Sequence, residues 1–209
     1  MVKILLVTIC ALAGSEIGIF FNPIVPITLR LKTFVQSEVD AMKIPLDQVC
    51  VRSGTLCDRC QRMIDEGVVE EFEMKLMSNL LDIEDKEIKE LKDSTYHKAF
   101  RADKLVILVV TSGAGMTPTK WIRVARILQD RIRAKVRVME KTTNIKVGAS
   151  QLLSPARVLG VNTVWLPDGT VQHVVRISRS EKRLLPVSEE ELEKILSKLY
   201  STQIRIRVE

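Results

Sequence analysis

The feature that most constrains the fold is residues 104–141, which read as a strand, a turn, a helix and a second strand. In order, the segments are KLVILVV, TSGAGMTPTK, WIRVARILQDRIRA and KVRVMEK. In the last of these, KVRVME alternates as a half-buried strand does. Apolar residues at helical spacing predict the buried face of the helix: Trp121, Val124, Ala125, Leu128 and Ile132. The other face carries Lys120, Arg123, Arg126, Asp130 and Arg133.

The positive charge of the chain is concentrated in this part of the sequence. Residues 94–140 hold ten Lys or Arg against three Asp or Glu, whereas residues 61–93 hold five against eleven. The whole chain of 209 residues has a formal charge of +6. A charge that changes sign between neighbouring segments favours a surface for a polyanion, with nucleic acid as the leading candidate. The alternative is a charged outer face that serves only solubility.

The first forty residues differ from the rest of the chain. Lys3 precedes the apolar run ILLVTICALAG, which is too short to span a bilayer. It could be a secretory signal, a membrane-associated segment or an extension ahead of a start at Met42. We favour the last interpretation, because the body of the chain resembles a nucleic-acid-binding protein. Residues 1–41 are therefore treated as an N-terminal extension.

The sequence after residue 41 predicts a cysteine-rich segment at 42–66, followed by two units at 67–141 and 142–209. In the first unit a helix precedes two strands and the basic helix. The apolar face of this first helix has residues at helical spacing: Val69, Phe72, Leu76, Leu80 and Ile83. In the second, a helix at 144–153 precedes a hairpin around the turn 167–170, a helix at 188–200 and the strand IRIRVE. The fold class is α+β, with two successive αββαβ units.

Three cysteines lie within eleven residues in the stretch 50–60, two of them as C-x-x-C. Thiolates at this spacing can converge on one Zn²⁺ through a tight turn. Asp47 precedes Cys50 by three residues, so Asp47, Cys50, Cys57 and Cys60 form a predicted four-ligand structural zinc site. A redox-active pair, a disulfide and plain buried thiols are the alternatives.

The turn before the basic helix does not match a nucleotide-binding loop. A P-loop that used Lys120 would need glycine at 119 and Ser or Thr at 121, where the chain has Thr119 and Trp121. His97 and His173 lie in predicted strands, and no nucleophile, base and acid form a set. The sequence therefore predicts a protein that is not an enzyme and has no small-molecule substrate.

Basic side chains on one helix face, next to a turn with accessible N–H groups, can neutralise phosphates and position a strand of nucleic acid. The residues predicted to contact nucleic acid share this face and the segment that follows it: Lys120, Arg123, Arg126, Arg133, Lys135 and Arg137.

The order αββ–loop–αβ with a basic second helix is similar to a type II KH domain, and two in tandem resemble NusA. The chain looks most like archaeal NusA-like proteins with a cysteine-rich N-terminus. Three segments carry this resemblance: KIPLDQVCVRSGTLCDRCQRMIDEG, RVARILQDRIRAKVRVMEK and SPARVLGVNTVWLPDGTVQHVVRIS.

The resemblance implies binding of single-stranded RNA and a cytoplasmic role in transcription elongation or termination, away from membranes. KH domains clamp RNA with a GxxG loop, which here falls at residues 119–122 and 187–190, and neither segment contains glycine. We therefore expect contact through side chains in the first unit. The alternative is a scaffold that docks on RNA polymerase or the ribosome.

Overall fold

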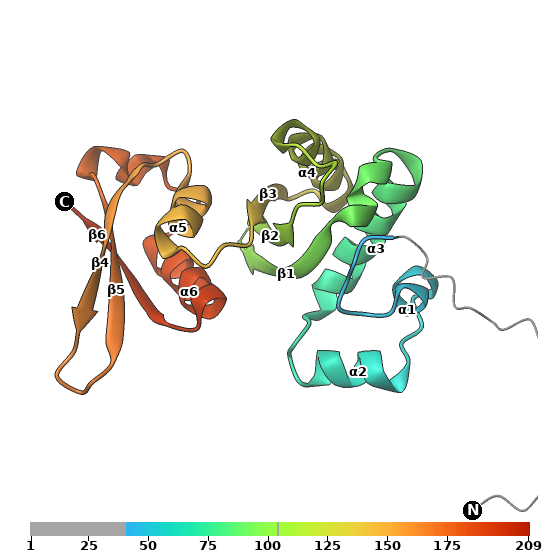
Figure 1. The fold of residues 1–209 in the computed structure, drawn as a ribbon, viewed down its shortest axis with the longest axis horizontal. Coiled ribbons are helices and arrows are strands. Elements are labelled where there is room, and N and C mark those ends of the chain that lie inside the picture. The colour runs from blue at the N-terminus through green and yellow to red at the C-terminus, as the bar shows by residue number, and fades with distance from the viewer. Residues whose placement is uncertain (1–40, 104) are drawn as a thin grey trace, which may run out of the picture. The chain divides into compact units, whose positions relative to one another are not determined.

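The computed structural model describes residues 41–103 and 105–209 (Figure 1). The predicted N-terminal extension lies outside the described residues except for Ala41. In the part that is described, no helix is long and apolar enough to cross a membrane.

The cysteine-rich segment consists of two short helices, α1 (Gln48–Ser53) and α2 (Asp58–Asp65). Helix α1 ends at Gly54, whose φ of 74° lies in the left-handed region. The segment is tied to the rest of the chain by a bridge between Lys43 and Thr95, at the start of the first strand.

The next elements form the first α/β unit. In chain order they are α3 (Glu71–Lys86), the 3₁₀ helix η1 (Lys89–Asp93), β1 (Thr95–Ala102), β2 (Leu105–Thr111), α4 (Pro118–Ile132) and β3 (Lys135–Glu140). The sheet order is β1-β2-β3, with β1 antiparallel and β3 parallel to β2. The predicted inward residues Trp121, Val124 and Leu128 of α4 are buried.

The second unit repeats the order of α-helices and strands, but its 3₁₀ helix follows the second strand: α5 (Ile145–Leu153), β4 (Val158–Trp165), β5 (Val171–Ile177), the 3₁₀ helix η2 (Arg179–Leu184), α6 (Glu189–Tyr200) and β6 (Gln203–Val208). Its sheet order is β4-β5-β6, again antiparallel and then parallel. The predicted turn closes the β4–β5 hairpin, with Gly169 at φ 82° and Asp168 accepting a hydrogen bond from the Thr170 N–H at 2.9 Å. Ser188 caps α6 by accepting the Glu191 N–H at 3.4 Å.

The two sheets are buried to different extents. Along β2, Val106, Leu108 and Val110 belong to a first core with α3, α4 and the cysteine-rich segment. The alternate residues Ile107 and Val109 belong to a second core together with α5 and α6. The second sheet contributes only one set of alternating residues to that core, from β5 and β6: Val175, Ile177, Ile204 and Ile206.

The structure therefore confirms the α+β class, with two three-stranded sheets that follow a cysteine-rich segment. The predicted boundary after residue 141 falls between β3 and α5, outside any helix or strand.

Candidate metal centre and nucleic-acid groove

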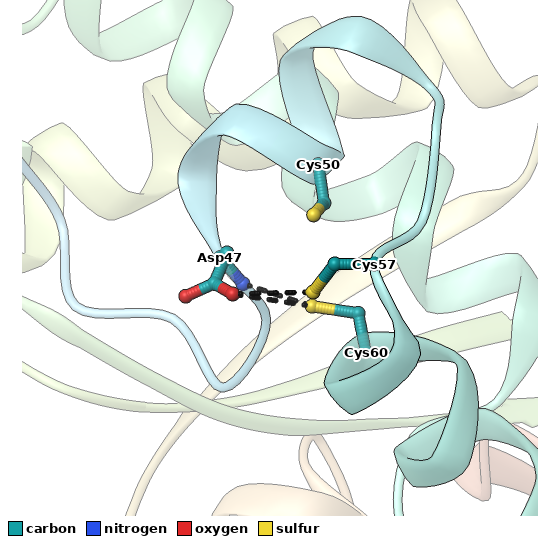
Figure 2. A group of neighbouring side chains, drawn as sticks. All are labelled: Asp47, Cys50, Cys57 and Cys60. Atoms are coloured by element: carbon teal, nitrogen blue, oxygen red, sulfur yellow. Dashed lines mark hydrogen bonds between the residues drawn. The ribbon is translucent and has the colours of Figure 1, made fainter.

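The four predicted metal ligands occupy matching positions in two helices (Figure 2). Asp47 is the N-cap of α1 and Cys57 is the N-cap of α2, and both have extended backbone conformations. Cys50 and Cys60 each lie three residues later, in the first turn of the same helix. Each helix thus supplies one ligand from its cap and one from its first turn, so the side chains converge.

The spacing of the ligand atoms suits a single metal ion. The three sulfurs and one carboxylate oxygen lie within 4.8 Å of one another. A tetrahedral Zn²⁺ with Zn–S bonds of about 2.3 Å places its ligands about 3.8 Å apart, so only small adjustments are needed. An iron–sulfur cluster is less suitable, because its cysteines must be separated by the width of the cluster. The arrangement can bind a metal ion.

Hydrogen bonds already hold these side chains together. The Cys57 thiol donates to Asp47 Oδ2 at 3.5 Å, and the Cys60 thiol donates to the same oxygen at 3.7 Å. The Asp47 N–H donates to Cys60 Sγ at 3.4 Å, a contact that would strengthen if the sulfur became a thiolate. Arg59 Nη1 lies 3.8 Å from Asp47 Oδ1 and offsets part of the negative charge of the ligand set.

The two thiols of the C-x-x-C motif differ in acidity. The Cys60 N–H hydrogen-bonds to the sulfur of Cys57 and lowers the pKa of that thiol. Burial raises the pKa of Cys60 to about 11, because an isolated thiolate would be poorly solvated there. A divalent cation reverses this effect by direct coordination, which deprotonates a thiol outright.

The ligand set is anchored to the first core. Cys50 and Cys60 are buried members of that core, whereas Cys57 and Asp47 are exposed. Arg52 of α1 forms a salt bridge with Asp85 of α3. The Met42 N–H donates to Glu84, also on α3, at 3.0 Å. A bound metal would therefore link α1 to α2, and the contacts with α3 hold this segment against the α/β unit that follows.

The six basic residues predicted to contact RNA are not equally available. Lys120 Nζ lies 2.9 Å from Glu90 and donates to the Gly115 carbonyl at 2.8 Å. Arg123 Nη2 lies 3.7 Å from Glu87. These contacts join α4 to the acidic end of α3 and η1, so part of the predicted basic face is engaged within the protein.

Arg126 and Arg137 line a groove of about 660 Å³ between α4 and β3. Among the described residues, Glu140 is the one acidic residue on its lining, and apolar side chains make up much of the rest: Met116, Trp121, Ile122, Ala125, Val136 and Val138. Arg137 Nη1 donates to the Leu152 carbonyl at 2.6 Å, and burial lowers the pKa of its guanidinium. The remaining two candidates are exposed outside the groove, Arg133 at the end of α4 and Lys135 at the start of β3.

A second hollow, of about 770 Å³, shares Arg137, Val138 and Gln151 with the groove. It adds Lys146 and Ser150 from α5. The sequence analysis missed these residues, because nothing in the sequence indicates that α5 lies beside β3. Their polar positions on the predicted helix 144–153 were the only signal.

The segment expected to replace a GxxG loop is not a loop. Residues 119–122 lie inside α4, because Thr117 caps the helix and Pro118 occupies its first turn. The preceding loop is packed closely instead. A Cβ on Gly113 would come within 2.4 Å of Asp93, and the Gly113 N–H donates to Ser94 Oγ at 3.1 Å. Packing thus accounts for this glycine.

Both histidines have partners within the sheets. His97 Nε2 lies 2.8 Å from Thr111 Oγ1, and His173 Nδ1 lies 3.2 Å from Thr163 Oγ1. Each pair joins two neighbouring strands of one sheet, as expected of a histidine with a structural role.

No protein-family model matches this chain, and no curated protein matches it. Among solved structures, the chain is similar to one described as "Crystal structure of APE1850". The two are 18% identical over 50% of this chain and 80% of the other, with a TM-score of 0.36. A similarity at this level carries no argument about function.

Proposed function

We propose that this protein is an RNA-binding accessory factor in transcription elongation or termination that contacts single-stranded RNA beside α4. The observation that carries the proposal is the groove between α4 and β3, which has a largely apolar lining and the exposed Arg126 at its border. The helix–strand–strand–helix–strand order of each unit supports reading both as degenerate type II KH domains. A cytoplasmic role without catalysis is part of this proposal.

The groove combines the two kinds of contact that single-stranded RNA uses. Arginines bind phosphates through charge-assisted hydrogen bonds. Apolar side chains accept the faces of unstacked bases, and Ile122, on the groove lining, is 56% exposed. Because no GxxG backbone clamp is present in the sequence, these side chains must supply the affinity. We expect weak binding that decreases steeply with salt.

We further propose that Asp47, Cys50, Cys57 and Cys60 hold a structural Zn²⁺. Three thiolates and one carboxylate at these separations suit its tetrahedral preference. The ion would supply a cross-link between α1 and α2. Its place beside the first core suggests that it supports the unit containing the groove.

A protein scaffold that docks on RNA polymerase or the ribosome is the second candidate. Val49 and Val68 favour it, because they are 77% and 50% exposed near the cysteine-rich segment. The acidic side of α3 and η1 gives it less support, since Asp82, Glu87 and Glu90 already pair with basic residues of α4.

The RNA proposal is tested by the Arg126→Glu variant and a matched Lys86→Glu control, which lies on α3 outside the groove lining. Anisotropy of a labelled single-stranded RNA is measured over a range of salt. Loss of one phosphate contact should weaken binding about five-fold at 0.1 M salt and reduce the salt slope by about 0.7. Equal affinities of the two variants would refute the groove assignment. Purification with and without nuclease then separates RNA-bridged partners from a scaffold.

A further inference from the structure

No described residue outside the second sheet contributes to a core on one of its faces, which we call the open face. Helices α5 and α6 lie on the other side of β4, β5 and β6 (Figure 1). Alternating burial assigns the side chains, because Val175, Ile177, Ile204 and Ile206 point into the second core. The residues between them, with their partners in register, form the open face: Gly160, Asn162, Val164, Gln172, Val174, Arg176, Gln203, Arg205, Arg207 and Glu209.

Three arginines lie close together on this face. Arg176 and Arg207 are direct partners on the parallel strands β5 and β6, and Arg205 lies two residues before Arg207. Neighbouring strands are about 4.8 Å apart, and alternate residues along a strand are about 6.6 Å apart. Glu209 is the one acidic residue of the set, with its Oε2 3.5 Å from Arg176 Nη1. Like charges in direct register destabilise a sheet, so a bound anion would relieve repulsion that the fold contains.

The position of Arg176 is built into the sheet. Its guanidinium lies over Gly160 of β4, where an added Cβ would approach Nη2 to 3.3 Å. Glycine within a strand is typical of such close approaches. The Nε of Arg176 is buried and has no hydrogen-bond partner among the described residues. This arginine is therefore held flat on the sheet before any ligand arrives, and one of its donors is unused.

The first turn of α6 in the same unit has the opposite charge. Glu189, Glu190 and Glu191 occupy the first turn of α6, where the sequence resemblance would place a GxxG clamp. Phosphate would be repelled there and attracted to the open face. The two units thus offer different surfaces to a polyanion, a helix-bordered groove in the first and a sheet in the second.

We propose that the open face binds the phosphate backbone of RNA through Arg176, Arg205 and Arg207, as a second contact surface apart from the groove. The proposal rests on the proposed function for the identity of the polyanion. Arginine suits this ligand, because its planar fork matches phosphate oxygens. The amides of Asn162, Gln172 and Gln203 add uncharged donors on the same face.

The test is the double variant Arg205→Glu/Arg207→Glu in the full chain, with both side chains exposed. The control, Lys194→Glu/Lys198→Glu, changes the net charge equally on the exposed side of α6. Binding of a labelled single-stranded RNA of mixed sequence is measured against salt. Loss of two contacts should lower affinity about 25-fold at 0.1 M salt and reduce the salt slope by about 1.4. The control should bind within two-fold of the unaltered protein, because residues that contact no phosphate release no counterions on binding.

An unchanged affinity of the sheet variant would overturn the proposal and leave the face to an acidic protein partner or to solvent. An equal loss in the control would also overturn it, because net charge alone would explain both. If the sheet variant is unchanged while Arg126→Glu loses binding, the proposed function stands without this surface. If neither variant loses binding, both fail. Should the double variant unfold, Arg205→Gln/Arg207→Gln is measured in its place. Cross-linking of thiouridine-containing RNA to the peptide with residues 203–209 gives an independent readout.

Discussion

The two sheets have the same topology but are used in different ways. The first sheet contributes to both cores, and every residue of β2 from Leu105 to Val110 is buried. The second sheet contributes to one core, and β6 alternates buried isoleucines with exposed arginines. A strand covered on both faces must be apolar throughout, whereas a strand with an open face can carry charge on alternate residues. The same chain order therefore allows the second sheet a surface role that the first cannot have.

The largest effect should come from loss of the proposed zinc site, whose buried cysteines belong to the first core. Cys60→Ser removes a buried ligand, so we expect bound zinc to be lost and α1 and α2 to unfold locally, at a cost of several kcal/mol. Metal analysis and hydrogen exchange measure this, with Asp58→Asn as a control in the same motif. Protection should fall in α1 and α2 and persist in β4, β5 and β6. Purified protein without zinc, or equal loss of protection in both units, would contradict the prediction.

Shortening one side chain in each sheet should distinguish a covered face from an open face, because the loss in the free energy of unfolding depends on burial. Ile107 is 0% exposed within the second core, so Ile107→Ala should reduce the free energy of unfolding by about 3 kcal/mol through lost burial and a cavity. Val174 on the open face is only partly buried, so Val174→Ala should cost less than about 1 kcal/mol. Urea denaturation compares the two. Similar losses would mean that the second sheet is covered on both faces.

Replacing one of two facing arginines should affect stability and binding in opposite directions. Arg207→Thr removes like-charge repulsion with Arg176 and introduces a good strand former. We expect the free energy of unfolding to rise by about 0.5 kcal/mol and RNA affinity to fall about five-fold at 0.1 M salt. Thermal unfolding and anisotropy measure these quantities. Lys194→Thr, a threonine substitution away from the sheet, is the control. A less stable variant with unchanged affinity would show that Arg207 serves the fold instead.

The smallest effect concerns the carboxyl group of Glu84, which is buried in the first unit. Burial raises the pKa of Glu84, whose carboxylate accepts the Met42 N–H. A raised folded-state pKa means that the contribution of this group is full below the unfolded pKa, near 4.5, and is lost as pH rises through the folded value. The free energy of unfolding should therefore fall less steeply with rising pH above 4.5 in Glu84→Gln than in the unaltered protein. Denaturation at a series of pH values tests this, and parallel curves for the two proteins would contradict it.

Much of the local structure could be predicted because it depends on neighbouring residues. Apolar spacing predicted α3 and α4, and the 167–170 turn predicted the β4–β5 hairpin. The proximity of Asp47 to the three cysteines was also predictable, since C-x-x-C spacing and a short loop limit where the ligands can lie. In both D-x-x-C and C-x-x-C the two ligands are three residues apart, which is the separation between the N-cap of a helix and a residue in its first turn.

Contacts between distant segments could not be read from the sequence. Lys120 and Arg123, predicted as phosphate ligands, pair with Glu90 and Glu87, which lie 30 and 36 residues earlier in the chain. The GxxG position was wrong, because Thr117 and Pro118 start α4 earlier than the apolar pattern indicates. Charge counts along the sequence do not show which charges face each other.

The sequence alone was enough for the α+β class, the turn chemistry and the closeness of Asp47 to the three cysteines, because each depends on spacings of a few residues. The pairing of α4 with α3 and the groove beside β3 required the tertiary structure. So did the open arginine face, since the IRIRV pattern shows alternation but not which face is covered. Coverage depends on helices α5 and α6, which pack on one side of the second sheet and complete the burial of the first.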